Sequence, residues 1–174
     1  MKSTGIIRRI DDLGRIVIPK EIRKNLKIKE NEVLEVFIED DKIILKKYSE
    51  LDDMNNIIEN FARALYELTS YNILITNRDK VIMCNENKKY EYINKEISID
   101  FYNIITNRIP ILSNDLKSIE IINNHSINAN YYISPIINNG DVLGSIVLFS
   151  NKKIDEKSIM YTDMILKLII NYID

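Results

Sequence analysis

The chain has 174 residues, of which 45% are apolar and 29% are charged, and its formal net charge at pH 7 is −2. These values are typical of a globular protein with one ordinary domain or two small ones. No apolar run approaches the roughly 18 residues that a membrane span needs, and the start lacks the apolar core of a signal peptide. The single Cys84 excludes an internal disulfide framework and fits a reducing compartment. We therefore expect a cytoplasmic location and no membrane partner.

Positive charge is concentrated at the start of the chain. Residues 1–29 carry nine Lys and Arg against three acids, a net of +6, whereas residues 30–45 and the part from Tyr48 onward each carry a net of −5. Arg suits bidentate contact with phosphate or guanine. This pattern favours a polyanion-binding surface over its alternative, a solvated strand edge that charge protects from aggregation. The candidate contact residues are Arg8, Arg9, Arg15, Arg23 and Lys24.

The first fifty residues predict a strand–strand–helix–strand–strand unit. We expect strands at 5–10 and 15–18 around an Asp11–Gly14 turn, a helix from Pro19 to Leu26, and strands at 32–38 and 42–48. So short a unit, without disulfide or metal, rarely buries enough apolar surface to fold alone. We therefore expect it to complete its core with a second copy.

A known family carries the same residues. The stretch STGIIRRIDDLGRIVIPKEIRKNLKIKENEVLEVFIEDDKIILKKY (residues 3–48) resembles the AbrB-type transition-state regulators, most specifically over DDLGRIVIPKEIRKNLKI. The resemblance implies a swapped-hairpin fold, in which two chains interleave into one dimeric β-barrel. It also implies that double-stranded DNA is the partner and that the five basic residues contact it. The layout of the whole chain resembles a regulator of late sporulation genes in the developing spore.

From residue 51 the pattern changes to helix and then antiparallel strands. Leu51, Met54, Ile58, Phe61, Leu65 and Leu68 form an apolar seam at alternating spacings of three and four, which predicts an amphipathic helix. Two strands are predicted within residues 71–85, on either side of a tight turn at Asn77–Lys80. Further strands are predicted at 115–122, 131–137 and 142–150, with a tight hairpin at Asn138–Asp141. Ser98 and Asp155 are expected to cap further helices.

This second half is similar to the GAF and PAS sensory domains, and SPIINNGDVLGSIVLFS (134–150) resembles their closing hairpin. The predicted fold class is therefore α+β, with domains at 1–50 and 51–174. In such domains a small ligand usually lies between the sheet and a crossing segment, here about residues 86–114. An unknown effector pocket and a purely oligomerising domain both remain open, and no cofactor is assigned.

The sequence offers little for catalysis or metal binding. His125 is expected in a polar turn and Cys84 in a buried strand. Because these are the only histidine and the only cysteine of the sequence, they cannot form a zinc site of Cys and His ligands. We expect no enzyme and no metal. The predicted function is a sequence-specific DNA-binding transcription regulator that forms dimers through its first domain and tetramers through its second. The alternatives are an antitoxin-like swapped-hairpin protein and a ligand-binding signalling module with incidental affinity for DNA.

Overall fold

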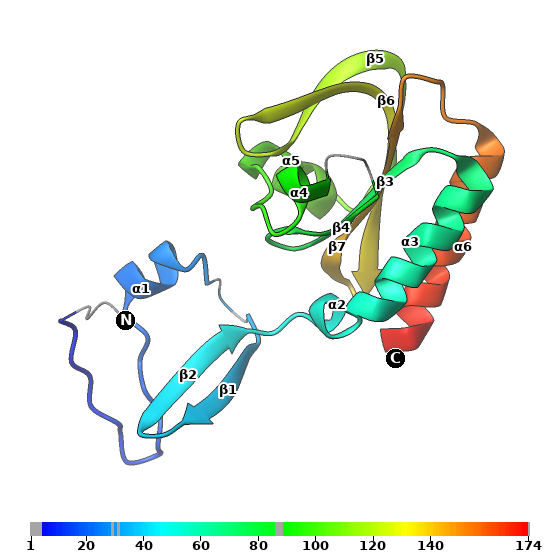
Figure 1. The fold of residues 1–174 in the computed structure, drawn as a ribbon. Coiled ribbons are helices and arrows are strands. Elements are labelled where there is room, and N and C mark those ends of the chain that lie inside the picture. The colour runs from blue at the N-terminus through cyan, green and yellow to red at the C-terminus, as the bar shows by residue number, and fades with distance from the viewer. Residues whose placement is uncertain (1–4, 29, 31, 86–88, 174) are drawn as a thin grey trace. The chain divides into compact units, whose positions relative to one another are not determined.

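The computed structural model describes residues 5–28, 30, 32–85 and 89–173. The chain is an α+β protein that divides into two compact units, Met1–Tyr48 and Ser49–Asp174 (Figure 1).

The first unit contains one short helix and one hairpin. Helix α1 (Lys20–Asn25) begins directly after Pro19, whose ring fixes the backbone φ at −57°. Strands β1 (Leu34–Glu39) and β2 (Lys42–Lys47) pair antiparallel in a continuous register from Leu34 opposite Lys47 to Glu39 opposite Lys42. The helix and both hairpin strands confirm the sequence prediction to within two residues at most ends.

The two strands predicted at 5–10 and 15–18 are wrong for the isolated chain. Both segments are irregular, and neither pairs with another described strand. The turn between them is present: the Gly14 amide donates to the Asp11 carbonyl at 2.9 Å, and Gly14 has a φ of +76° that favours glycine. A strand is defined by its ladder to a neighbour, so alternating apolar residues alone do not make one.

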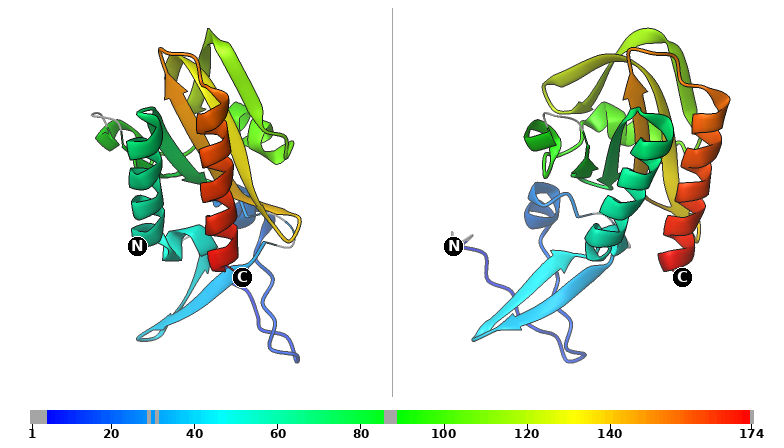
Figure 2. Two further views of the ribbon diagram at one scale, coloured as in Figure 1. Left: turned by 90° about the vertical axis from the view of Figure 1, so that its right-hand side faces the viewer. Right: turned by 45° about the vertical axis from the view of Figure 1, so that its right-hand side comes forward.

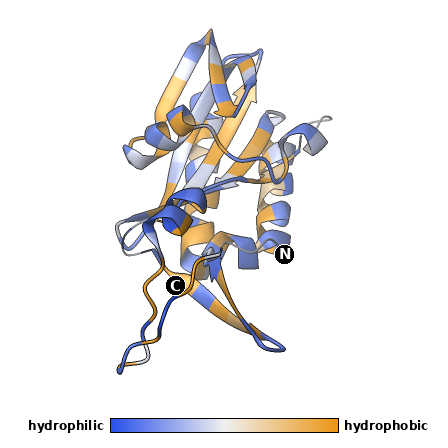
Figure 3. Cartoon of the chain, turned by 90° about the vertical axis from the view of Figure 1, so that its left-hand side faces the viewer, coloured by the Kyte–Doolittle hydropathy of each residue, from blue (hydrophilic) through white to orange (hydrophobic). Residues whose placement is uncertain are grey.

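The first unit also leaves most of its large apolar side chains in solvent. Pro19 is its only buried residue among those that the structure describes. Figure 3 shows hydrophobic stretches along the extended N-terminal segment and the β1–β2 hairpin. The most exposed apolar side chains belong to Ile7, Ile10, Leu13, Val17, Val33, Val36, Ile38 and Ile43, at 60% or more. The single chain therefore lacks a core in this unit.

The second unit is built on one five-stranded antiparallel sheet with strand order β4-β3-β7-β6-β5. Its helices are α2 (Glu50–Asp53), α3 (Asn55–Thr69), α4 (Lys89–Tyr92), α5 (Ile99–Thr106) and α6 (Glu156–Ile173). Its strands are β3 (Asn72–Asn77), β4 (Val81–Cys84), β5 (Ile111–Ile122), β6 (His125–Asn138) and β7 (Asp141–Ser150).

The sheet separates two apolar layers. Helices α3 and α6 run side by side on one face, and α4 and α5 lie on the other (Figures 1 and 2). The α3/α6 layer packs on residues such as Ile73, Ile146 and Leu148, and the α4/α5 layer on residues such as Ile133 and Val147. Neighbouring strand residues point to opposite faces, so the apolar runs of β6 and β7 supply both layers.

Turn and cap predictions in this unit are confirmed. Asn138 pairs with Asp141, and both loop residues between them have positive φ, at 49° for Asn139 and 83° for Gly140. The Ser98 side chain accepts a hydrogen bond from the Phe101 amide at 3.0 Å. The Asp155 carboxylate accepts from the Ser158 amide at 2.8 Å at the start of α6.

Three expectations for the second unit need correction. The predicted helix over the seam is two helices, α2 and α3, which Met54 separates. Strands β5 and β6 are longer than predicted, starting at Ile111 and His125, because each extends the ladder with the other. His125 therefore lies in a strand and not in a turn. The ladder, a tertiary feature, outweighed the polar residues that predicted a loop.

Candidate nucleic-acid interface

The five predicted contact residues all lie in the first unit, on two segments. Arg8, Arg9 and Arg15 are exposed residues of the irregular segment around the Asp11–Gly14 turn. Arg23 and Lys24 lie in the last turn of α1, where Arg23 is half-buried and Lys24 is exposed. Cations at a helix C-terminus also interact favourably with the helix dipole. The structure thus places the five residues in one small unit, and no described contact joins the cations of one segment to those of the other.

Asp11 holds the backbone and the guanidinium of Arg15. Asp11 Oδ1 accepts hydrogen bonds from the amides of Leu13 at 3.0 Å and Arg15 at 2.8 Å, and Arg15 Nε donates to Asp11 Oδ2 at 2.8 Å. The Arg15 amide, and then its guanidinium, lower the pKa of Asp11 below its ordinary value of 3.8. The Arg15 side chain nevertheless stays 71% exposed. An exposed guanidinium whose backbone is held by an ordered turn is well suited to contact a phosphate or the edge of a nucleobase.

Sequence reasoning missed Asp11 as a positioning residue. An Asx-type turn, in which an aspartate accepts from amides a few residues ahead, was the available signal. The pattern Asp11-Asp12-Leu13-Gly14-Arg15 contains it, with the cation one residue after the glycine. The sequence predicted Asp11 as part of the turn and as a negative charge, without a role for its side chain. The geometry indicates instead that it orders the turn that carries Arg15.

The two residues that were considered for catalysis or metal binding, Cys84 and His125, lie in strands of the second unit. Cys84 is a buried thiol, 3% exposed. The His125 ring lies 2.9 Å through Nε2 from the Tyr92 hydroxyl and packs edge-on against the Tyr92 ring. Across the residues that the structure describes, no three His, Cys, Asp or Glu side chains gather as a metal site. No helix in the same residues has the length and apolar character that crossing a membrane requires.

Comparison with known proteins agrees with this division into two units. A family model described as "Stage V sporulation protein T C-terminal, transcription factor" matches residues 50–168. The chain is also 43% identical to stage V sporulation protein T of Bacillus subtilis (strain 168) over 152 residues, which cover 86% of this chain and 85% of that protein. The chain belongs to the stage V sporulation protein T family. It is accordingly a DNA-binding transcription regulator with a link to sporulation.

The two ends of the chain have separate further relatives. The transition state regulatory protein AbrB of B. subtilis is 60% identical over 48 residues, which cover 28% of this chain and 50% of that protein. A second family model, "Antidote-toxin recognition MazE, bacterial antitoxin", matches residues 7–53. The crystal structure of a GAF domain/HD domain protein from Geobacter sulfurreducens is also similar, with a TM-score of 0.56 and 11% sequence identity. The similarity covers 69% of this chain and 91% of that chain. The second unit thus has the GAF fold that the sequence predicted.

Proposed function

We propose that this protein is a sequence-specific regulator of late sporulation genes that contacts double-stranded DNA through Arg8, Arg9, Arg15, Arg23 and Lys24. The observation that supports it is the net charge of +6 over residues 1–29 on a chain whose total is −2. A local basic surface on an acidic molecule attracts a polyanion while the remainder limits unspecific contacts. The ordered Arg15 supplies a candidate for direct contact with a base edge.

The active form of the first unit is an interleaved dimer. Its exposed apolar residues and its segment 5–18, which forms no β-ladder with another described strand, are the features that support this proposal. A second copy would pair with the segment and cover the apolar side chains, so that two swapped hairpins form one barrel. Each dimer then presents two sets of the five cations, related by a two-fold axis.

The full-length protein is a tetramer held by α3 and α6 of the GAF-like domain. The predicted seam itself supports this less than expected, because Leu51, Ile58 and Leu65 are fully buried in their own domain. A different set remains exposed: Met160, Met164, Leu168 and Tyr172 recur every four residues along α6 at 46–62% exposure. This stripe lies away from the buried residues of α6 and is suited to pack on a second helix pair.

The remaining features fit a cytoplasmic regulator that is associated with the nucleoid of the developing spore. We infer no catalytic role, because Cys84 is buried and the His125 ring is hydrogen-bonded to the Tyr92 hydroxyl. The GAF-like domain serves as the oligomerising part and as the sensor of a small molecule. Of the crossing segment 86–114 that was expected to hold a ligand, residues 86–88 lie outside the described residues, and Phe101 and Ile105 are fully buried.

An antitoxin is the second candidate, because the antitoxin family model matches residues 7–53. In that case the protein would copurify with a toxin at a fixed ratio. A ligand-binding module with incidental affinity for DNA is the third reading. Affinity-purified protein from a sporulating culture, analysed by mass spectrometry for a stoichiometric partner, tests the second candidate.

A fluorescence anisotropy titration of full-length protein with duplex DNA at several salt concentrations tests the main proposal. Binding should weaken as salt rises, with a slope of about −0.9 in log–log form for each phosphate neutralised. A promoter duplex from a late sporulation gene should compete better than a shuffled duplex of equal composition. Equal competition by both duplexes would reduce the function to unspecific binding.

A further inference from the structure

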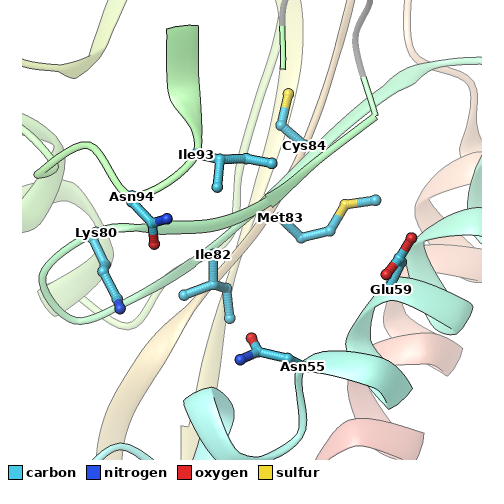
Figure 4. A pocket seen from close by; sticks show the side chains of 8 residues that line it. All are labelled: Asn55, Glu59, Lys80, Ile82, Met83, Cys84, Ile93 and Asn94. Atoms are coloured by element: carbon cyan, nitrogen blue, oxygen red, sulfur yellow. The ribbon is translucent and has the colours of Figure 1, made fainter. Parts of the chain in front are cut away.

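A cavity of about 310 Å³ opens beside the edge strand β4 of the GAF-like domain (Figure 4). Residues of α3, of β4 and its preceding turn, and of the segment after α4 line it. Its volume is at the lower limit of small-molecule sites, which are about 300–1,000 Å³. The cavity therefore suits a compact ligand.

One end of the cavity carries hydrogen-bond donors that suit an anion. Lys80 and Asn94 lie at this end in Figure 4, whereas the Asn55 amide lines the cavity beside Ile82. Lys80 is held in place: its Nζ lies 3.2 Å from Asp52 Oδ2, while Asp52 Oδ1 accepts from Asn77 Nδ2 at 2.7 Å. An ammonium and a neighbouring amide can both donate charge-assisted hydrogen bonds to a carboxylate.

The middle of the cavity is apolar and its other end is acidic. Ile82 and Met83, both half-buried, lie between Lys80 and Glu59 in Figure 4. These side chains offer contact to a short hydrocarbon tail, whose burial is favourable in proportion to its area. Glu59, paired with Arg63 at 3.5 Å, would repel a second carboxylate at the far end of the ligand.

We propose that this cavity binds a small monocarboxylic acid with a short apolar tail, its carboxylate on Lys80 and its tail on Ile82 and Met83. The ligand carboxylate competes with Asp52 for the Lys80 ammonium. Asp52 belongs to α2, the first helix after the N-terminal unit in the chain, and its bonds to Lys80 and Asn77 fasten α2 to the β3–β4 turn. Ligand binding thereby loosens α2 and changes affinity for DNA, a step that rests on the proposed function.

Calorimetry on the full-length protein without DNA tests the site. The probes are 4-methylpentanoate, 4-methyl-2-oxopentanoate and leucine, which share the carboxylate and branched tail and represent a fatty acid, an oxo acid and an amino acid. At least one probe should bind, and the probe that binds most tightly identifies the chemical class of the ligand. Lys80→Gln should weaken that binding at least about tenfold, since a charged hydrogen bond is lost, while the exposed Lys152→Gln serves as the matched control. No binding by any probe, or equal binding by Lys80→Gln and wild type, would overturn the proposal.

A second variant keeps the test valid if Lys80→Gln fails to fold. The Glu59 side chain is 61% exposed, so Glu59→Gln leaves the core intact. The wild type should exclude heptanedioate, a longer unbranched dicarboxylate whose second carboxylate would reach the Glu59 end, and Glu59→Gln should bind it. Heptanedioate that binds the wild type as tightly as the monocarboxylates contradicts the orientation of the ligand.

Adding the best ligand to the DNA titration tests the coupling. The apparent DNA affinity of the wild type should change with ligand, and that of Asp52→Asn should not, because this variant lacks the carboxylate that competes for Lys80. A ligand that binds through Lys80 but leaves wild-type DNA affinity unchanged overturns the coupling alone. Protein that binds the ligand but no DNA contradicts the proposed function and leaves the site intact.

Discussion

Arg15 is the proposed contact residue whose local geometry is best defined. Asp11 orders the turn before it and bonds its Nε, yet most of the side chain remains in solvent. The sequence located the cation correctly as an exposed residue after a glycine turn. It did not reveal that the neighbouring acid is a partner, because charge counting ignores which backbone amides an aspartate can reach.

Replacing Arg15 by Ala should weaken DNA binding by about 1–3 kcal/mol if the guanidinium reads a base. Anisotropy titrations on specific and shuffled duplexes at several salt concentrations measure this. If Arg15 contacts only phosphate, both duplexes should lose affinity equally and the salt slope should shrink by about one. Arg63→Ala is the matched control, since Arg63 is an exposed arginine on α3. Unchanged affinity in a folded Arg15→Ala protein would remove Arg15 from the interface.

Tyr132→Phe should destabilise the second unit by about 1–2 kcal/mol, because a buried hydroxyl loses its hydrogen bond to a carboxylate. The Tyr132 hydroxyl donates to Asp163 Oδ1 at 2.9 Å, linking β6 to α6. Thermal denaturation at neutral pH measures the loss. Tyr66→Phe, on α3 and 46% exposed, should change stability little.

The same tyrosine predicts a dependence on pH. Burial raises the pKa of Tyr132 from 10.0 to about 12, and the Asp163 carboxylate adds to the rise. A raised pKa in the folded state means that the stabilisation is complete below pH 10 and is lost as pH rises toward 12. Between these values the wild type should therefore lose more stability than Tyr132→Phe. Parallel stability curves of the two proteins would contradict the burial of this hydroxyl as the cause.

At the scale of elements, the pairing of strands β3 and β7 leaves no room for a side chain at Gly144. Thr76 pairs with Ser145 and Asn77 with Gly144, and the Thr76 and Ser145 hydroxyls lie 2.9 Å apart. A Cβ on Gly144 would fall on the Thr76 carbonyl oxygen and lie 2.8 Å from its carbon. The sequence predicted both strands, but a lone glycine within a strand does not indicate which neighbour requires it.

Gly144→Ala should therefore destabilise the protein by about 3 kcal/mol or more, at or above the usual range for overpacking. Gly140→Ala is the matched comparison: its Cβ meets open space, and only its φ of +83° opposes the change. That variant should lose about 1–2 kcal/mol. Denaturant unfolding of both proteins decides the order. A smaller loss for Gly144→Ala than for Gly140→Ala would show that the two strands separate easily.

At the scale of the whole molecule, the fragment Met1–Tyr48 should have no stable folded monomer. Most of its large apolar side chains are exposed, and its segment 5–18 forms no β-ladder with another described strand in the single chain. Folding and association then form one equilibrium, so the melting temperature should rise with protein concentration. Circular dichroism melts over a hundredfold range of concentration, together with sedimentation, test this. A monomer with a melting temperature independent of concentration rules out the interleaved dimer.

The full-length protein should have the mass of four chains in light scattering. The double substitution Met164→Glu and Leu168→Glu, in the exposed α6 stripe, should convert the tetramer to a dimer that still binds DNA. Avidity should fall because two binding dimers are no longer tethered. Leu116→Glu, a residue of β5 with 56% exposure, is the control that adds charge outside the stripe. A wild-type mass of two chains excludes the tetramer.

The sequence by itself determined the elements whose signals are local. The Asn139-Gly140 turn, the Ser98 and Asp155 caps and the β1–β2 hairpin depend on residues a few positions apart, and each was predicted correctly. The net charge of each segment also indicated the candidate interface from the sequence alone. Tertiary structure decided the features that depend on distant neighbours. Only packing could show that Leu65 is buried in its own domain, that His125 extends a strand beside β5, and that Lys80 meets Asp52. A strand or a buried seam is defined by its partner, and the partner's position is not encoded in the spacing of one segment.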